Sequence, residues 1–304
     1  MRAVTKAHET EGPASVADRI DIAESRREGL RPLLFRCGGG GWNIGRELKH
    51  LDSVTVDTSP GADIQLDAET LSFGEMSPQL LRYADVPFIR KLRSLLRGRD
   101  IAFVVTSLGG FAGGSGAVVV SRVASALSVP VIASVALPFG AEGGVRRAEA
   151  RRDLGRLQES ANMTAAFENN IVLESAPGLK VAQALTLMNR IVSSPIAEML
   201  KHVDAGWAGG LMGKHYRCTY AVDYSSGEGW EKKAAEALLA QMHDAVRTAG
   251  AVCLFVESAS APAESAARIA RQMEKKCGAR KFTVWARERR EEGQNRVAAF
   301  MLSE

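Results

Sequence analysis

Glycines follow a predicted strand at two places in this chain, and glycines in that position can form a phosphate site. Residues 38–45 read Gly-Gly-Gly-Gly-Trp-Asn-Ile-Gly and come directly after the predicted strand 33–37. Residues 106–117 contain five glycines and follow the apolar run 101–105. A strand that turns through glycines into a helix lets backbone N–H groups converge on an anion, and the helix N-terminus adds a favourable partial charge. The alternative interpretation is a flexible turn between strand and helix.

Two common nucleotide-binding patterns are absent from the first glycine segment. The dinucleotide pattern G-x-G-x-x-G fails from each of its first three glycines, because a later glycine is missing. The Walker pattern fits only from Gly40 to Gly45, and Arg46 and Glu47 take the places of its lysine and hydroxyl residue. These failures disfavour both a nicotinamide oxidoreductase and a P-loop enzyme.

Candidate phosphate ligands are therefore backbone N–H groups, which need small residues for close approach. Ser115 could add a hydroxyl to a phosphate or to Mg²⁺, and its alternative role is a helix cap. Asp57 ends the predicted strand 53–57, where Rossmann proteins place a ribose-binding acid, and its alternative is an acid facing solvent. The glycines expected to line the site are Gly39, Gly40, Gly41, Gly109, Gly110, Gly113, Gly114 and Gly116.

Three motifs, in this order along the chain, carry a family resemblance. Gly38–Asn43 resembles an early G-G-G-G-x-N loop, and Gly109–Gly116 resembles a signature loop G-G-G-T-G-[ST]-G with one extra residue and Ala112 in place of threonine. Pro138–Arg146 matches P-F-x-x-E-G-x-x-R at the same spacing. In these motifs the chain resembles the tubulin/FtsZ family of GTPases, over roughly residues 31–304.

The resemblance implies a role for each matching residue in binding GTP or GDP. It places Asn43 beside the guanine and ribose, and Glu142 and Arg146 at the ribose and guanine edge. It gives Asn189 a hydrogen bond to guanine, and it brings the loop at Asp57 to the phosphates and Mg²⁺. The alternatives are a helix cap for Asn43, an ordinary i, i+4 ion pair for Glu142 and Arg146, and a solvent-facing Asn189.

One departure from the family concerns hydrolysis. The resemblance implies that acids after the central helix, in N-x-D-x-x-D or N-x-D-x-x-E, position water in the next subunit. The corresponding segment, 201–210, keeps one acid, Asp204, as the only candidate catalytic residue. An asparagine expected after the fifth strand is replaced by Ser175 within 174–178. We therefore expect slow hydrolysis or none, and whether the chain is an enzyme stays open.

The expected fold class is α/β, with a Rossmann-like parallel sheet, a long central helix and a smaller C-terminal α+β domain. The helices following the two glycine segments are expected at 46–50 and 117–127, and the central helix at 179–200. The strands of the first domain are expected at 33–37, 53–57, 101–106, 129–135 and 170–173. The domains are expected to be an arm at 1–29 with a short helix over 16–26, a GTP-binding domain at 30–177, a central helix at 178–203 and a C-terminal domain at 204–304.

Composition supports a large core and few special partners. Apolar residues make up 46% of the chain, and the net charge of +4 is small for 304 residues, so no nucleic-acid partner is expected. The four cysteines form no C-x-x-C pair, and no resident metal site is predicted. The absence of a signal peptide or membrane-length apolar segment predicts a cytoplasmic protein.

Two functions remain in competition. The first is a divergent FtsZ-like GTP-binding cytoskeletal protein, with GTP or GDP and Mg²⁺ as ligands. Its expected partners are further copies of itself, in a head-to-tail filament or dimer as in cell division, and a membrane adaptor. The second is a nucleotide-free structural or scaffolding homologue. Bound guanine nucleotide in the purified protein would separate the two.

Overall fold

The chain forms two compact units in the computed structural model, which describes residues 20–24, 30–289 and 293–304. Of the described residues, 30–221 and 300–304 belong to the larger unit, and 20–24, 222–289 and 293–299 belong to the smaller unit. Among the described residues, no helix combines the length and the apolar character needed to cross a membrane.

A parallel sheet forms the centre of the larger unit, with strand order β8-β7-β6-β5-β2-β3-β4. Six of seven residues in both β5 and β6 are buried, as expected for central strands covered on both faces. Because the strands are parallel, the chain leaves β2, β3, β5 and β6 at one edge of the sheet. The strands are β2 (Pro32–Cys37), β3 (Ser53–Asp57), β4 (Ile64–Gln65), β5 (Ile101–Ser107), β6 (Val131–Leu137), β7 (Met163–Glu168) and β8 (Tyr216–Ser225).

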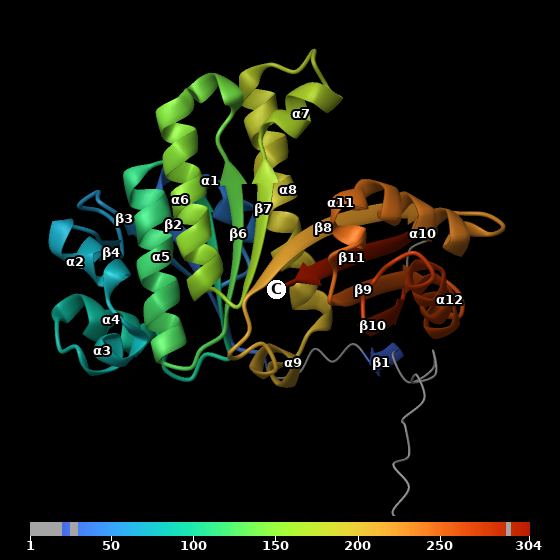
Figure 1. Cartoon of the computed structure of the whole chain (residues 1–304), viewed down its shortest axis with the longest axis horizontal. Helices are drawn as coiled ribbons and strands as arrows, with labels where there is room; N and C mark the ends of the chain where they lie inside the picture. Colours follow the sequence, from blue (N-terminus) through green and yellow to red (C-terminus); the bar gives the residue numbers. More distant parts are fainter. Residues whose placement is uncertain (1–19, 25–29, 290–292) are drawn as a thin grey trace, which may run out of the picture. The chain divides into compact units, whose positions relative to one another are not determined.

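Helices cover both faces of this sheet (Figure 1). The main apolar core lies between the strands and α3 to α6, with Val119, Val120 and Val123 of α5 fully buried. On the other face α1 packs against α8. The helices are α1 (Gly38–Gly45), α2 (Ala68–Ser72), α3 (Pro78–Tyr83), α4 (Pro87–Leu96), α5 (Phe111–Ala126), α6 (Gly144–Ser160), α7 (Asn170–Ser175), α8 (Val181–His202) and α9 (Ala205–Gly209).

The long helix α8 runs against the direction of the strands. It begins beyond the carboxyl end of β7, and its other end leads into α9 at the opposite edge of the sheet (Figure 1). Ser134 in β6 donates a hydrogen bond of 2.6 Å to the carbonyl of Val192 and fixes the helix against the sheet. Its 22 residues span about 33 Å. The two ends of α8 are therefore at opposite edges of the larger unit.

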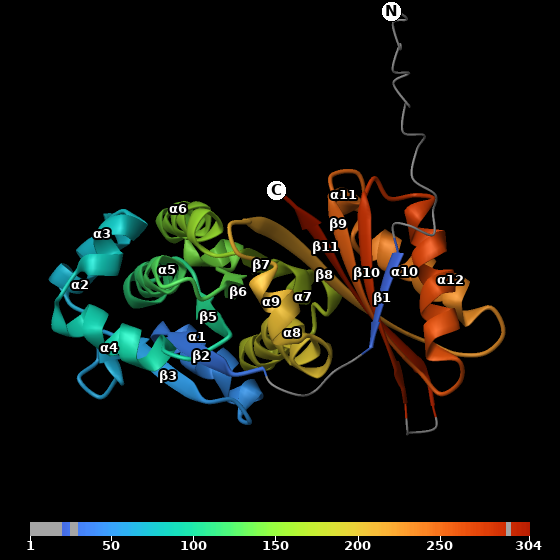
Figure 2. The same ribbon diagram turned by 90° about the horizontal axis from the view of Figure 1, so that it is seen from below.

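In the described part of the chain, four strands and three helices make up the smaller unit, and the strands can be followed in Figure 2. Strands β1, β10 and β9 pair in parallel, and β11 follows β9 in the strand order. Helix α12 packs on β9 and β10, and Phe255 stacks on Trp285 with ring centroids 4.8 Å apart. The elements are β1 (Ile20–Glu24), α10 (Trp230–Gln241), α11 (His243–Val246), β9 (Ala251–Ser258), α12 (Pro262–Glu274), β10 (Lys281–Glu288) and β11 (Asn295–Ser303).

The predicted α/β fold class is confirmed, but one strand was wrongly placed. Residues 170–173 were expected to form a strand, whereas they lie in α7 and the strand is β7, at Met163–Glu168. A short apolar run such as Ile171–Leu173 does not distinguish a strand from a helical turn. In β7 the sequence Met-Thr-Ala-Ala-Phe-Glu is less apolar, and pairing with β6 makes it a strand.

The two helices after the glycine segments begin earlier than expected. The predicted starts at 46 and 117 are wrong, because α1 begins at Gly38 and α5 at Phe111. Glycine is a poor helix former, and tertiary packing overrides that preference here. The glycine segments are thus largely the first turns of helices.

The N-terminal arm also differs from expectation. A helix was expected over 16–26, whereas Ile20–Glu24 forms strand β1, and 16–19 and 25–26 lie outside the described residues. The alternation Ile-Asp-Ile has the period of a strand, and β1 pairs with Phe282–Ala286. Helices α2, α3 and α4 were not predicted. The four-part division of the chain stays a prediction.

Candidate functional site

The two glycine segments meet at the carboxyl edge of the larger unit's sheet. Gly38 has φ +68°, and a Cβ built on it would lie 2.9 Å from both the Cα and the N of Gly113. Neither α1 nor α5 has a side-chain cap, because their N-cap residues are Cys37 and Gly110. The first N–H groups of a helix lack intrahelical partners. Two uncapped helix starts in direct contact form a site that favours an anion.

Most of the glycines in this site are required by packing. A Cβ at Gly40 would collide with Ser107, one at Gly41 with the carbonyl of Val105, and one at Gly114 with the carboxylate of Asp153. A Cβ at Gly113 would lie 2.7 Å from the carbonyl of Ser107, and one at Gly116 would lie 2.8 Å from Leu66. These five glycines let α1 and α5 approach the sheet and α6, whatever else they do.

At two other positions, packing does not require glycine. A Cβ at Gly39 or at Gly110 would meet no atom within 4 Å. Gly110 has extended backbone angles, φ −112° and ψ 146°, that any residue can adopt. Gly109 differs, because its φ of +82° favours glycine and a Cβ there would lie 2.9 Å from Arg146 Cγ. The open space beside Gly39 and Gly110 is therefore where a ligand could approach the backbone.

A cavity of about 360 Å³ lies beside the start of α1. Asn43 lies inside α1 and is exposed, so the alternative role of N-cap does not apply to it. Trp42 is also exposed, and Arg46 stacks on its ring at 5.1 Å. The cavity is lined by Arg36, Gly38, Gly39, Trp42, Asn43, Thr55, Asp57, Ser59, Gly61 and Ala62.

Asp57 forms one wall of this cavity. Its Oδ1 accepts hydrogen bonds of 3.3 Å from the backbone N of Ser59 and from the hydroxyls of Thr58 and Ser59. Burial, and secondarily the charge of Asp57, raise the pKa of the Cys37 thiol far above its usual value, so this cysteine stays protonated. Asp57 is thus positioned by its own loop, with its second oxygen available.

Glu142 and Arg146 form the i, i+4 ion pair that was the alternative to a ligand role, at 3.0 Å. Glu142 also accepts a hydrogen bond of 2.7 Å from the backbone N of Phe139. Both side chains are partly exposed, and Arg146 lies against Gly109. The structure therefore brings this pair next to the second glycine segment.

Asn189 and Ser115 are half-buried on α8 and α5. The neighbouring Arg190 lies 3.8 Å from Glu47, just after α1, so Asn189 is close to the end of that helix. Ser115 lies in the second turn of α5, so it is not the N-cap.

Sequence reasoning missed the asparagines that follow β7. Because β7 ends at Glu168, the next residues are Asn169 and Asn170, and the assignment of Ser175 to this position was wrong. Asn170 Oδ1 accepts a hydrogen bond of 2.9 Å from the backbone N of Gly140. Asn169 is buried, and its Oδ1 has no hydrogen-bond partner among the described residues. The two consecutive asparagines after the weakly apolar segment 163–168 were the sequence pattern that could have indicated this position.

Asp204 lies at the other end of α8, about 33 Å from its start. It is the N-cap of α9, and its Oδ1 accepts a hydrogen bond of 2.8 Å from the backbone N of Trp207. The structure therefore separates Asp204 from the glycine site and gives it a structural role.

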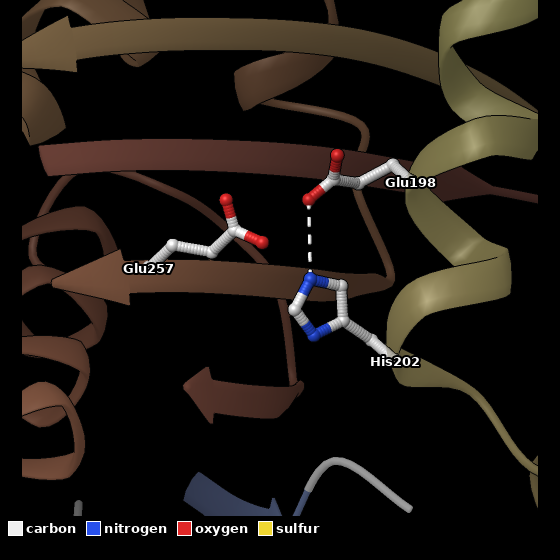
Figure 3. A group of neighbouring side chains, drawn as sticks. All are labelled: Glu198, His202 and Glu257. Carbon is white, nitrogen blue, oxygen red and sulfur yellow. Dashed lines mark ion pairs between the residues drawn. The ribbon is translucent and has the colours of Figure 1, made fainter. Parts of the chain in front are cut away.

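A buried ion pair that the sequence did not suggest lies near this end of α8 (Figure 3). Glu198 and His202 are one helical turn apart, with Oε1 and Nε2 separated by 3.3 Å, and Lys201 lies 3.6 Å from Glu198. Glu198 and His202 are each 1% exposed. These contacts lie at the end of α8 opposite the glycine site.

The chain is similar in sequence to curated FtsZ proteins. No protein-family model matches it. FtsZ from Methanothermobacter thermautotrophicus is 26% identical over 215 residues, covering 64% of this chain and 56% of that protein. FtsZ 1 from Halobacterium salinarum is 29% identical over 171 residues, covering 51% and 43%. The chain spans about half the length of these curated relatives.

Solved structures share the fold over nearly the whole chain. An empty FtsZ dimer from M. jannaschii has a TM-score of 0.71 at 18% identity, covering 91% of this chain and 89% of that one. CetZ1 from Haloferax volcanii, a GDP-bound monomer, has a TM-score of 0.64 at 15% identity, covering 90% and 94%. The fold is that of the tubulin/FtsZ proteins. The predicted resemblance is confirmed, because the chain is similar to FtsZ proteins in sequence and shares their fold.

Proposed function

We propose that this chain is a guanine-nucleotide-binding cytoskeletal protein that associates with itself and hydrolyses GTP slowly or not at all. The observation that carries the proposal is the contact between two uncapped, glycine-rich helix starts at the carboxyl edge of a parallel sheet. Sequence similarity to proteins named for cell division, and a fold shared with a GDP-bound CetZ1, support it.

The phosphates would bind at the starts of α1 and α5. Backbone N–H groups there can donate to several phosphate oxygens, and both helix dipoles favour negative charge. Gly39 and Gly110 leave room for this approach. Oxygen ligands suit Mg²⁺, and Asp57 and Ser115 would hold it; the ion would offset phosphate charge.

The base would lie toward β6 and α8. Guanine carries N–H donors and a carbonyl acceptor, so it pairs well with carboxylate and amide side chains. Glu142 and Asn189 supply these groups, and Asn169 adds a buried amide oxygen that lacks a partner among the described residues. This arrangement supports a preference for guanine over adenine.

Slow turnover follows from the position of Asp204. A carboxylate about 33 Å from the start of α8 cannot reach a nucleotide in the same molecule. A second copy, stacked head to tail, could present it, which is why self-association belongs to the proposal. Asp204 already accepts the capping hydrogen bond of α9, which limits its freedom to position water.

Nucleotide released from the purified, denatured protein tests the proposal. We expect GDP or GTP in the extract, identified by chromatography. An extract without nucleotide, from protein that also fails to bind added GTP, would favour the scaffolding alternative. NAD in the extract would restore the oxidoreductase hypothesis.

A further inference from the structure

We propose that Arg36 contacts the terminal phosphate of the bound nucleotide, in the cavity beside α1. The inference rests on the proposed nucleotide-binding function and adds a residue to it. Arg36 is the penultimate residue of β2, and its side chain lines the cavity together with Gly38, Gly39 and Asp57. It is the only lysine or arginine among the residues that line the cavity.

The stem of Arg36 is fixed beneath α1. Gly45 is the last residue of α1, and a Cβ there would collide with Cγ and Cδ of Arg36. The absence of a side chain at Gly45 therefore makes room for the arginine. Since these carbons pack against the helix, the guanidinium has few directions left, and one of them is the cavity.

Arg36 is half-buried, and the buried nitrogen of its guanidinium has no hydrogen-bond partner among the described residues. Its Nε is fully buried without a hydrogen bond, and no ion pair of Arg36 occurs within the described part of the chain. The nearest acids are engaged elsewhere. Asp57 accepts from Ser59, and Asp63 accepts from the backbone N and hydroxyl of Thr55 at 2.8 and 2.7 Å. Those Thr55 bonds are the main cause that lowers the pKa of Asp63, and the charges of Arg36 and Lys91 contribute less.

A buried Nε–H without an acceptor favours an anion from outside the chain. Arginine keeps its positive charge in proteins, so it cannot avoid the cost of burial by losing a proton. A buried donor without a partner destabilises the fold. An incoming phosphate would satisfy Nε and match the planar donor set of the guanidinium.

The strand order indicates which phosphate this is. The groups proposed for the base follow β6 or lie on α8, and the central phosphate site follows β5 and β2. The cavity lies between α1 and the loop after β3, one strand further from β6. A nucleotide laid across the edge in this order places its last phosphate nearest Arg36. The affinity for GTP should therefore depend on Arg36 more than the affinity for GDP.

Isothermal titration of the wild-type chain and of Arg36→Met, with GTP and with GDP, tests the inference. We expect Arg36→Met to weaken GTP binding by about 10- to 100-fold, because a hydrogen bond to a charged group is lost, and GDP binding by less than about threefold. Arg36→Lys should recover part of the loss. Arg90→Met, an exposed arginine on α4, is the control for the change in net charge.

Thermal unfolding without nucleotide separates a ligand role from a structural role. Removing a half-buried guanidinium with an unpaired Nε, while keeping the stem, should leave the Tm of Arg36→Met equal to the wild type or higher. A lower Tm would overturn the inference, and so would equal losses for GTP and GDP, or no loss for either. Wild-type protein that binds neither nucleotide would contradict the proposed function instead. Titration with inorganic tripolyphosphate would then test Arg36 directly, since only the wild type should bind it.

Discussion

The two ends of α8 differ in whether their polar groups already have partners. At the start of α8, the carboxyl edge of the sheet holds two uncapped helix starts. It also holds two buried atoms without a partner among the described residues, Nε of Arg36 and Oδ1 of Asn169. At the other end, the candidate catalytic acid Asp204 is already the cap of α9. Groups reserved for a ligand stay unsatisfied in the free protein, whereas a satisfied group contributes to the fold.

This difference gives a physical reason for expecting binding without fast turnover. Binding a phosphate requires N–H donors that are free and fixed in place, and the uncapped starts of α1 and α5 have such donors. Hydrolysis in a filament would need an acid that is free to orient water. Asp204 would have to break or share its hydrogen bond with Trp207 before it could do so.

The largest effect is expected from a substitution that fills the open space beside Gly110. Gly110→Val should weaken GTP binding at least about 100-fold, or 2.8 kcal/mol, because a branched side chain would occupy the approach to the phosphates. The backbone angles of Gly110 suit valine and no protein atom is near, so the Tm should not change. Titration calorimetry and thermal unfolding measure the two effects.

Gly114→Val is the matched control for that substitution. Its side chain would collide with Asp153 between α5 and α6, so the Tm should fall, by about 1–3 kcal/mol of stability. Normal GTP binding by Gly110→Val would show that the glycine segment 106–117 is only a turn between strand and helix. Equal loss of stability in both variants would remove the distinction between open and packed glycines.

The next largest effect concerns recognition of the base. Asn189→Ala should weaken GTP binding by about 1–3 kcal/mol if its amide pairs with guanine, because a partly buried hydrogen bond is lost. The preference for GTP over ATP should fall with it. Fluorescence competition with both nucleotides measures the ratio, and an unchanged ratio would assign Asn189 to the helix surface.

Substitutions at Asp204 probe the far end of α8. Asp204→Ala should destabilise the protein by about 1 kcal/mol through loss of the cap, whereas Asp204→Asn should keep the cap. Both should bind GTP as the wild type does. Phosphate release separates the roles, because a catalytic carboxylate predicts that both variants lose the residual turnover. Residual turnover that survives in Asp204→Asn would assign Asp204 to capping alone.

The smallest effect is a dependence of stability on pH through Asp153. Burial raises the pKa of this carboxyl, with partial opposition from Arg156 and Arg152. A folded pKa above the unfolded value means that the folded state binds the proton more tightly, so stability falls as pH rises from about 4 through the folded pKa. Asp153→Asn should raise the Tm at pH 7, and the gain should vanish below about pH 4. A gain that persists at pH 3 would point to packing instead.

The sequence predicted the sheet better than the helices. The bounds predicted for β3 are correct, because Ser-Val-Thr-Val-Asp alternates with the period of a strand. Those predicted for β5 are correct within one residue, because a strand buried on both faces has a continuous apolar run. The helix starts at Gly38 and Phe111 were not predicted, because glycine has a low helix propensity. Contacts with the sheet outweigh that low propensity in the folded chain. Strand β7 was not predicted, because its pairing with β6 is a long-range interaction that the local sequence does not show.

The candidate site shows the same limit. Glycine segments and the Pro138–Arg146 motif are local patterns, and their positions along the chain could be predicted. That Gly38 touches Gly113, or that Gly39 is open while Gly40 is packed, depends on tertiary contacts. In the sequence, Arg36 is a single charged residue within an apolar strand, and only the structure shows that it lines a cavity. Roles that depend on what a side chain lacks cannot be predicted from sequence.

Titration of the purified chain with GTP and with ATP, combined with phosphate release in the same samples, tests the central claim most directly. We expect GTP to bind at least about tenfold more tightly than ATP, a difference of 1.4 kcal/mol. Phosphate release should be far slower than from an FtsZ that carries both acids, even where sedimentation shows polymers. Equal affinity for the two nucleotides, or turnover at the rate of that FtsZ, would contradict the account.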